Sequence, residues 1–312
     1  MARINDIRLY GIVAENPTIH KDNQTGEFLK GFCTVIIIGR QKTDLKPALY
    51  NYPRILTRNP EQITEMAKWE KNDVVEIKGS LTTKNMTKTK ICEKCGEKIK
   101  HPGTVVYVHP IFSEIRKSNL TQPEAIEEIN NNVEISNSAV LMGVLCREPQ
   151  LFENKTSHKK LTAYQLAVKR RFRIAEDPAE TDVDFPWVKS YNEQGISDAK
   201  TLYKGSVVLI DGKLQVRERE VKEICPFCQH ENSWKDYSME VVPHAVEYMR
   251  NFHSPEEILE KEKTYLQNLK SEIFSSESEL VFNATKPDDY VELEKTEEEK
   301  SVDLLIQKVF ES

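Results

Sequence analysis

The sequence predicts an all-β core in which one domain occurs twice in tandem, followed by an acidic tail. Two strand-like runs, each led by a glycine, end in Cys-x-x-Cys motifs that we call knuckles, Cys92/Cys95 and Cys225/Cys228. The glycine, a leucine, a basic residue and both cysteines recur at an offset of 133 residues, and further landmarks upstream recur at 132. Because chance rarely keeps one offset over so many positions, we interpret the chain as a tandem duplication.

The first copy reads as five strands and one helix. Asn59, followed by Pro60 and Gln62, has the pattern of a helix start. The chemistry of a hairpin turn lies at 22–26. The strand-like runs are 8–13, 28–38, 49–55, 73–83 and 104–108.

Five strands with a helix between the third and the fourth is the strand order of an OB-fold barrel. In that order, the knuckle of each copy lies in the loop between strands four and five. This loop is one of the two that usually frame the nucleic-acid groove of the fold. The sequence therefore predicts two tandem OB-fold β-barrels with zinc-knuckle loops.

We divide the chain into OB-fold domain 1 (1–117, copy one), a linker (118–136), OB-fold domain 2 (137–250, copy two) and an acidic helical or disordered tail (251–312). The linker should hold one or two helical turns. In the tail, Ser254 and Pro255 predict a helix start. The Ser-rich, acidic stretch 274–299 predicts disorder, and 301–310 reads as a short amphipathic helix. This last helix either docks a partner or packs back on the barrels.

Charge is distributed unevenly along the chain. Lys and Arg against Asp and Glu give +7 for residues 1–120, −4 for 121–250 and −9 for 251–312. The basic front suggests a polyanionic partner. No apolar stretch is long enough to span a membrane, and the first residues do not resemble a signal peptide. With four of six cysteines in knuckles, we expect a reducing compartment, the cytoplasm.

Copy two resembles the bacterial single-stranded-DNA-binding (SSB) proteins over about 80 residues. The resemblance lies in the segments 137–151, 164–172, 184–188 and 203–214, the last with the pattern KGS-x-V-x-(I/V)-x-G-x-L. Copy one carries a weaker, collinear version. The chain lacks the acidic, Pro-Phe-ended tip of that family and has the knuckles as insertions, so we expect a divergent form of phage or conjugative-element origin.

The resemblance implies a groove that stacks bases on aromatic rings and neutralises phosphates, so that affinity falls with salt. The aromatic candidates are Tyr52, Phe172, Phe185 and Trp187, with Arg40 at the place in copy one that matches Phe172. The basic candidates are Arg40, Lys42, Arg54, Lys84 and Lys88 in copy one and Lys169, Arg170, Arg171, Arg173 and Arg217 in copy two. The alternative for each aromatic is an ordinary core position, and for each basic residue a solvated strand face.

The knuckles predict a structural zinc ion, because cysteine pairs at this spacing are typical zinc ligands. Two cysteines fill half of a tetrahedral site, which leaves three completions. All four can share one ion, as an ancestral symmetric dimer would after duplication; local histidines can complete two sites; or no metal binds. The histidine candidates are His101, His109, His230 and His244. We expect Cys33 and Cys146, at non-equivalent strand positions, to be core residues.

Two function classes compete. The first is sequence-independent binding and protection of single-stranded DNA in replication, recombination or transfer, with RNA as an open alternative and a homodimer as a further expectation. The second is a protein-interaction scaffold without direct DNA coating, and replication or recombination proteins are candidate partners of the tail in either case. We predict that the protein is not an enzyme, since the sequence contains no phosphate-binding loop, no H-E-x-x-H motif and no nucleophile–base set.

Overall fold

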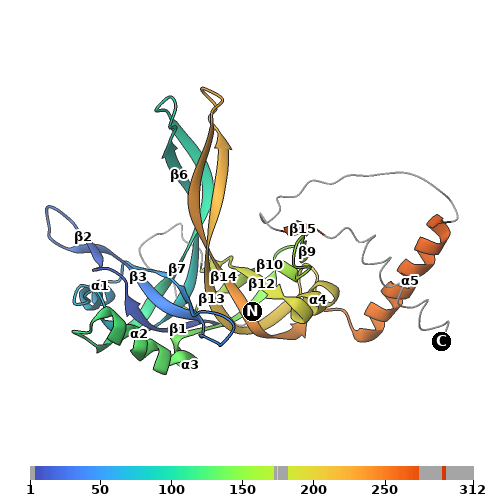
Figure 1. Ribbon diagram of the computed structural model, residues 1–312, viewed down its shortest axis with the longest axis horizontal. Coiled ribbons are helices and arrows are strands. Elements are labelled where there is room, and N and C mark those ends of the chain that lie inside the picture. The colour runs from blue at the N-terminus through green and yellow to red at the C-terminus, as the bar shows by residue number, and fades with distance from the viewer. Residues whose placement is uncertain (1–3, 172–173, 175–181, 274–289, 293–312) are drawn as a thin grey trace. The chain divides into compact units, whose positions relative to one another are not determined.

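The computed structural model describes residues 4–171, 174, 182–273 and 290–292, which are mainly β-strands (Figure 1). They form two compact units. The first comprises the described residues of 1–143, 166–188 and 209–247, and the second comprises those of 144–165, 189–208 and 248–312.

Copy one has the predicted order of elements. Its elements are β1 (Ile4–Val13), β2 (Thr18–Lys21), β3 (Phe28–Arg40), β4 (Leu49–Asn51), β5 (Arg54–Thr57), α1 (Pro60–Met66), β6 (Val74–Ile91) and β7 (Lys98–Lys117). The pairing runs β1, β6, β7, β5, β3 and back to β1, which closes a five-stranded ring. The pair β5–β7 is parallel, with Ile55 opposite Val108. This is the OB-fold order, with α1 between the third and fourth strands of the ring and capped by Asn59 as predicted.

Copy two repeats this order. Its elements are β8 (Asn137–Leu145), β9 (Gln150–Asn154), β10 (Lys160–Lys169), β11 (Val183–Asp184), β12 (Trp187–Tyr191), α4 (Asn192–Thr201), β13 (Val207–Ile224) and β14 (Glu231–Arg250). The strands pair in the order β8, β10, β12, β14, β13 and back to β8. Again one pair is parallel, β12–β14, with Val188 opposite Val241. The predicted tandem OB-fold is confirmed.

Equivalent glycines show that the duplication extends to backbone detail. A Cβ atom on Gly79 would lie 2.3 Å from the carbonyl oxygen of His109, and one on Gly212 would lie 2.4 Å from that of Val242. The two glycines are 133 residues apart, and so are the two carbonyl groups, those of His109 and Val242. Only glycine allows so close an approach of two strands, which explains why it leads both runs.

Each knuckle lies in the loop between the fourth and fifth strands of its barrel, as predicted, but these strands are so long that the loop is the tip of a long hairpin. Strands β6 and β7 pair from Val74 opposite Lys117 to Ile91 opposite Lys98, with register shifts between Val74 and Val75 and between Lys78 and Gly79. From Gly79 opposite Pro110 to the tip the register is constant. Thr and Lys alternate along the outer part of β6, and such polar side chains suit an exposed two-stranded ribbon. Side chains on the same face of the ribbon still contact their neighbours on the opposite strand. Figure 1 shows this hairpin and the β13–β14 hairpin side by side, in agreement with the contacts given below.

The predicted linker is helical over more than the one or two turns expected. It contains α2 (Gln122–Asn131) and α3 (Val133–Ser136). Thr121 and Glu124 form a capping box at the start of α2. Ala125 and Ile129, four residues apart on one helix face, are buried against Tyr10 and other side chains of copy one. This segment is therefore part of the core of the first unit.

The two copies meet along their first strands within the first unit. Strands β1 and β8 are antiparallel, from Ile4 opposite Met142 to Leu9 opposite Asn137. An antiparallel pair of equivalent strands has an approximate two-fold axis between them, as in an isologous dimer interface. The copies are thus related as the subunits of a symmetric dimer would be.

Side chains repeat this relation on both sides of the axis. Asn5 donates from Nδ2 to the carbonyl oxygen of Leu81 (2.8 Å) and accepts from its N–H (2.7 Å). Asn137 makes the same two bonds with Leu214, both of 2.9 Å. Each pair satisfies two buried backbone groups of a β-strand.

The second unit contains a buried polar network of its own. The carboxylate of Asp198, in α4, accepts hydrogen bonds from the hydroxyls of Tyr164 (3.1 Å), Ser190 (2.5 Å) and Tyr248 (2.8 Å). Burial raises the pKa of Asp198, an effect that these donors reduce. All three hydroxyls and the carboxylate are satisfied by one another, so we interpret the network as structural.

The tail begins with α5 (Pro255–Ile273), as predicted. Ser254 caps it, accepting from the N–H of Glu257 (3.2 Å), whose carboxylate accepts from the N–H of Ser254 (2.7 Å). A short strand, β15 (Tyr290–Glu292), follows. Most of the predicted disordered stretch and all of the predicted helix at 301–310 lie outside the described residues. Among the described helices, none has the length and apolar character needed to cross a membrane.

Candidate nucleic-acid interface and metal centre

The tips of the two hairpins bring all four knuckle cysteines together. The four Sγ atoms lie within 4.8 Å of one another. Cys92 and Cys228 are 3.6 Å apart, and their equivalents by the offset of 133, Cys225 and Cys95, are 3.7 Å apart. Cys92 and Cys225 are buried beside Ile99. The approximate two-fold relation of the copies therefore extends to the cysteine cluster.

This geometry favours the shared site among the three completions. In the part of the chain that the structure describes, the cluster of candidate metal ligands contains these cysteines and no histidine. His101 instead pairs with Glu223 (3.1 Å) and lies edge-on to Trp234, with 5.8 Å between ring centroids. His109 is buried elsewhere, where desolvation and the charge of Arg170 lower its pKa to about 4.

The donor set can hold a soft divalent cation. The backbone N–H of Cys95 and then that of Lys94 lower the pKa of the Cys92 thiol to about 6, which favours the thiolate that a metal requires. At Cys95 the Glu97 N–H lowers the pKa, but burial and the neighbouring sulfurs outweigh it and raise the value to about 12. Without a metal, four thiols this close together do not all lose their protons, because the resulting thiolates would repel one another. A cation at their centre would offset that repulsion.

Cys33 and Cys146 lie outside the metal site, as predicted, but only Cys33 is a core residue, since Cys146 follows the end of β8 and is half-buried. Cys33 is buried, and desolvation raises its pKa to about 12. Burial also raises the pKa of Cys146. Neither belongs to the cysteine cluster.

Polar contacts brace the hairpins between the cysteines and the barrels. Lys88 of β6 pairs with Asp236 of β14 at 2.6 Å, and both side chains are largely buried. The N–H of Glu93 donates to Oδ1 of Asn232 (3.0 Å). Lys88, predicted to neutralise a phosphate, thus has its charge compensated within the protein.

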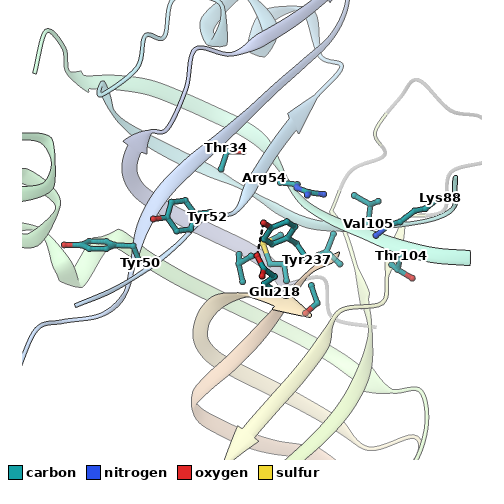
Figure 2. A pocket seen from close by; sticks show the side chains of 13 residues that line it. Thr34, Tyr50, Tyr52, Arg54, Lys88, Thr104, Val105, Glu218 and Tyr237 are labelled. Atoms are coloured by element: carbon teal, nitrogen blue, oxygen red, sulfur yellow. Dashed lines mark hydrogen bonds between the residues drawn. The ribbon is translucent and has the colours of Figure 1, made fainter. Parts of the chain in front are cut away.

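Tyr52, Arg54 and Lys88 line one open groove of about 540 Å³ in the first unit (Figure 2). Tyr52 lies between β4 and β5 and is 51% exposed. Arg54 begins β5 and places its guanidinium carbon 5.7 Å from the centroid of the Tyr237 ring. The structure therefore gathers an aromatic and two cations that the sequence analysis proposed separately.

The sequence analysis missed the side of this groove that copy two supplies. Tyr237 of β14 is 48% exposed and donates from its hydroxyl to Glu218 of β13 (3.1 Å). The offset pairs Tyr237 with Thr104 in copy one, so the repeat gave no reason to expect an aromatic there. Only the hairpin geometry could place it opposite Tyr52.

The other basic candidates of copy one lie on its surface. Arg40 ends β3, is exposed and donates to the carbonyl oxygen of Pro47 (3.2 Å). Lys42, just beyond β3, and Lys84, on β6, are exposed. Their positions are compatible with phosphate contacts, but these residues do not line the groove.

Copy two places its candidates differently. Phe185 is 42% exposed, and its N–H donates to Oγ1 of Thr83 (2.8 Å). Trp187, at the start of β12, is half-buried. Lys169 pairs with Asp182 (3.2 Å), and Arg217 pairs with the buried Glu240 (2.9 Å).

Arg170 is buried in an ion pair with Asp184 at 2.8 Å, not displayed on a strand face. A buried guanidinium requires a carboxylate partner, and this one has no exposure with which to meet a phosphate. We therefore leave Arg170 out of the interface. Arg171 is exposed, whereas Phe172 and Arg173 lie outside the described residues.

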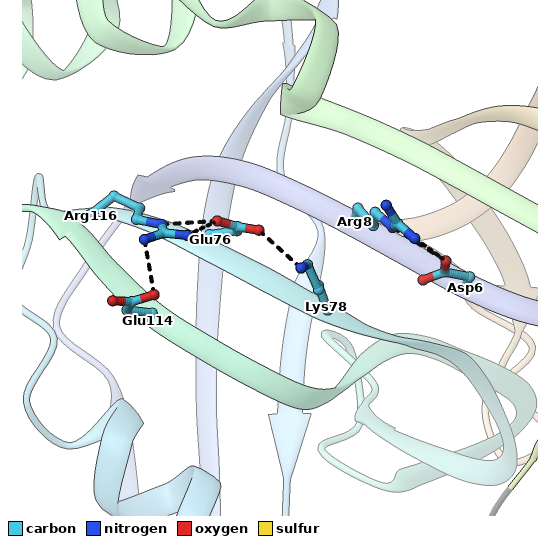
Figure 3. A network of polar contacts seen from close by, with 6 residues as sticks. All are labelled: Asp6, Arg8, Glu76, Lys78, Glu114 and Arg116. Atoms are coloured by element: carbon cyan, nitrogen blue, oxygen red, sulfur yellow. Dashed lines mark hydrogen bonds and ion pairs between the residues drawn. The ribbon is translucent and has the colours of Figure 1, made fainter.

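One face of copy one offers little attraction to a polyanion because its charges are compensated locally (Figure 3). Arg116 bridges Glu76 (2.5 Å) and Glu114 (3.0 Å), and Lys78 also approaches Glu76 (3.6 Å). The hydrogen bond from Arg116 lowers the pKa of Glu76. Ion pairs of this kind fix the face without leaving a net positive patch.

Known proteins were compared with the chain. Residues 136–247 match the model of the Single-strand binding protein family. Single-stranded DNA-binding protein 1 of Staphylococcus aureus (strain MSSA476) is 31% identical over 113 residues, which are 36% of this chain and 65% of that protein. Single-stranded DNA-binding protein 2 of Chlorobaculum tepidum is 31% identical over 81 residues, 26% of this chain and 55% of that protein. The matched part spans less than two thirds of these relatives.

A solved structure extends the likeness in fold beyond copy two. The wild-type single-stranded DNA binding protein from Thermus aquaticus is similar with a TM-score of 0.50 and 18% sequence identity. The similarity covers 81% of this chain and 97% of that one. Because copy two is only about a third of the chain, coverage this large includes copy one.

Proposed function

We infer that the chain, whose residues 136–247 match the single-strand binding protein family, binds single-stranded DNA with little sequence preference. It would stack bases on exposed aromatic rings and neutralise phosphates with the surrounding Lys and Arg side chains. Its role would be protection of single strands during replication, recombination or transfer. The relatives that carry single-stranded DNA binding in their names support this inference.

The observation that carries the proposal is the groove of copy one. It combines exposed Tyr52 with Arg54 in an open channel on a strand of an OB-fold barrel. A base presents a π-face whatever its sequence, so an exposed ring binds all bases at roughly 1–3 kcal/mol each.

A metal ion is the second part of the proposal. We propose that Cys92, Cys95, Cys225 and Cys228 share one structural Zn²⁺, since four thiolates are a typical closed zinc set. When bound, the ion would supply no chemistry to DNA; it would fasten the two hairpin tips to each other.

We also propose the domain layout given above, a homodimer and a partner-binding role for the tail. The layout rests on the repeated strand order. The dimer and the tail rest on the family resemblance and on the acidic composition of residues 251–312.

Fluorescence anisotropy with a labelled oligo-dT at two salt concentrations tests the function. We expect tight binding of the oligo-dT that weakens as the salt concentration rises. Duplex DNA should not displace the bound oligo-dT. The extent to which oligo-U displaces it measures the preference for DNA over RNA. Absence of binding at low salt would favour the scaffold.

Single substitutions test the two exposed stacking candidates, Tyr52 in the groove of copy one and Phe185 on copy two. Tyr52→Ala and Phe185→Ala should each weaken oligo-dT binding by roughly five- to a hundred-fold, because each removes one stacking platform. Phe112→Ala is the matched control: Phe112 is 43% exposed on β7, lies outside the groove and should leave affinity unchanged. Equal effects at all three positions would mean that the loss is not specific to stacking.

A further inference from the structure

The groove of copy one is incomplete without the hairpin of copy two. Its lining residues come from β3 to β7 of copy one and from β13 and β14 of copy two, all within the first unit. Figure 2 shows Tyr52, Tyr237 and Lys88 following one another across the groove. Two repeats therefore build one binding surface together.

The aromatic side chains of this surface remain available to a ligand. Tyr52 and Tyr237 each keep about half of their surface exposed. Arg54 already lies over the Tyr237 ring, at 5.7 Å from its centroid. A base that stacks on Tyr237 would extend an arrangement of guanidinium and ring that the protein holds ready, with cation–π attraction added to stacking.

The charges around Tyr237 favour a base over a phosphate at this point. Glu218 accepts from the Tyr237 hydroxyl and pairs with Lys235 at 2.6 Å. Lys88 is held by Asp236, the residue before Tyr237. Lys88 and Lys235 are thus compensated, and Arg54 lies over the ring itself. Beside the carboxylate of Glu218, a phosphate gains less at this point than the π-face of a base that stacks on the ring.

These contacts also fix the ring. The Tyr237 hydroxyl is tied to Glu218, and the Lys88–Asp236 ion pair holds β14 against β6 beside it. A platform that is positioned before binding loses less conformational entropy on binding. Exposed aromatics that merely cover a strand have no need of such support.

The equivalent place on the other side of the two-fold relation lacks the platform. The offset of 133 puts Thr104 where copy two has Tyr237, and Trp187 where copy one has Arg54. The composite surface is therefore particular to the groove of copy one.

We propose that Tyr237, supplied across the repeat by the copy-two hairpin, is a base-stacking residue of the copy-one groove, with Tyr52 and Arg54 as its neighbours. This rests on the proposed function and specifies it: the ligand class at this subsite is a nucleobase of a single strand. One strand would then contact both repeats at once.

The test uses the full-length protein and an oligo-dT that carries photoreactive 5-iododeoxyuridine. Irradiation followed by mass spectrometry should find adducts on the peptides of both Tyr52 and Tyr237. In anisotropy titrations, Tyr237→Ala should weaken binding by roughly five- to a hundred-fold, while Tyr237→Phe, which keeps the ring and loses only the hydroxyl, should stay within a few-fold of the unsubstituted protein.

The outcomes separate the two proposals. Failure of the unsubstituted protein to bind oligo-dT overturns the proposed function. Binding that depends on Tyr52 but is unchanged by Tyr237→Ala, with no adduct at Tyr237, overturns only the composite subsite. Equal losses for Tyr237→Phe and Tyr237→Ala would also overturn it, because the ring would then not be the group that matters.

Discussion

The two copies agree at the paired first strands and at the cysteine cluster and differ where they face a groove. Asn5 and Asn137 make the same pair of hydrogen bonds, and the four cysteines form two equivalent pairs. In contrast, Arg54 corresponds to Trp187 and Tyr237 to Thr104. The cysteine pairs join the two copies, so a change in either copy affects both, whereas a groove residue affects only its own groove.

One contact of the centre shows how far the copies have already diverged. Asn51 accepts from the N–H of Val216 (3.1 Å), and its equivalent, Asp184, accepts from the N–H of Thr83 (2.8 Å). Asp184 additionally carries the ion pair with Arg170. The same backbone task is thus done by an amide in copy one and by a carboxylate in copy two.

The largest expected effect concerns the cysteine cluster. Replacing Cys92 and Cys225 by Ser removes one thiolate from each knuckle, so the protein should lose its metal completely, and hydrogen exchange should accelerate in both hairpin tips. The barrel strands β1 and β8 should stay protected, because their pairing does not involve the tips. Metal content by elemental analysis and hydrogen exchange by mass spectrometry measure the two effects.

The stoichiometry distinguishes a shared site from separate ones. The unsubstituted protein should contain one zinc per chain under reducing conditions, and Cys146→Ser should leave that value unchanged, since Cys146 lies outside the cluster. Two ions per chain would contradict the shared site, and no stoichiometric metal would contradict the zinc proposal.

The next largest effect should separate Asp184 from Asn51. Asp184→Ala leaves the buried Arg170 without this carboxylate and should lower the free energy of unfolding by about 3–5 kcal/mol. Asn51→Ala removes an uncharged acceptor and should cost about 1–3 kcal/mol. Urea unfolding gives both values, with Asp44→Ala on an exposed loop as the control. Equal costs would show that the ion pair adds nothing to the hydrogen bond.

A smaller effect on the free energy of unfolding should come from the titration of His109, a histidine that only copy one has at this position. His109 has its pKa lowered to about 4 from 6.5, and its equivalent in copy two is Val242. The unfolded chain takes up this proton at higher pH than the folded one, so stability should be full above pH 6.5 and fall as pH drops from 6.5 to 4. The loss is at most about 3 kcal/mol.

His109→Val, which copies the residue of copy two, should flatten this dependence. Urea unfolding at several pH values, with both proteins kept metal-free by a chelator, measures it without interference from pH-dependent metal release. The titration of the Cys92 thiol is common to both proteins and cancels in the comparison. If the two proteins lose stability in parallel between pH 6.5 and 4, other groups cause the loss.

Several features of the site could be read from the sequence because they repeat or follow local rules. The offset of 133 predicted the shared cysteine cluster among its alternatives, and the family pattern pointed to Tyr52 and Phe185 as surface aromatics. Arg170 could not be judged in this way. A basic run gives no sign of which member turns inward to a carboxylate, since that depends on where Asp184 lies in space.

The sequence by itself determined the duplication, the strand order of each barrel and the cysteine pairs, because periodicity, caps and motif spacing are properties of neighbours along the chain. Only the tertiary structure decided that the knuckles sit at the tips of long hairpins, that the linker helix belongs to the core of copy one, and that Tyr237 completes a groove on the other repeat. Each of these depends on contacts between residues far apart in the chain, and local sequence patterns do not reveal such contacts.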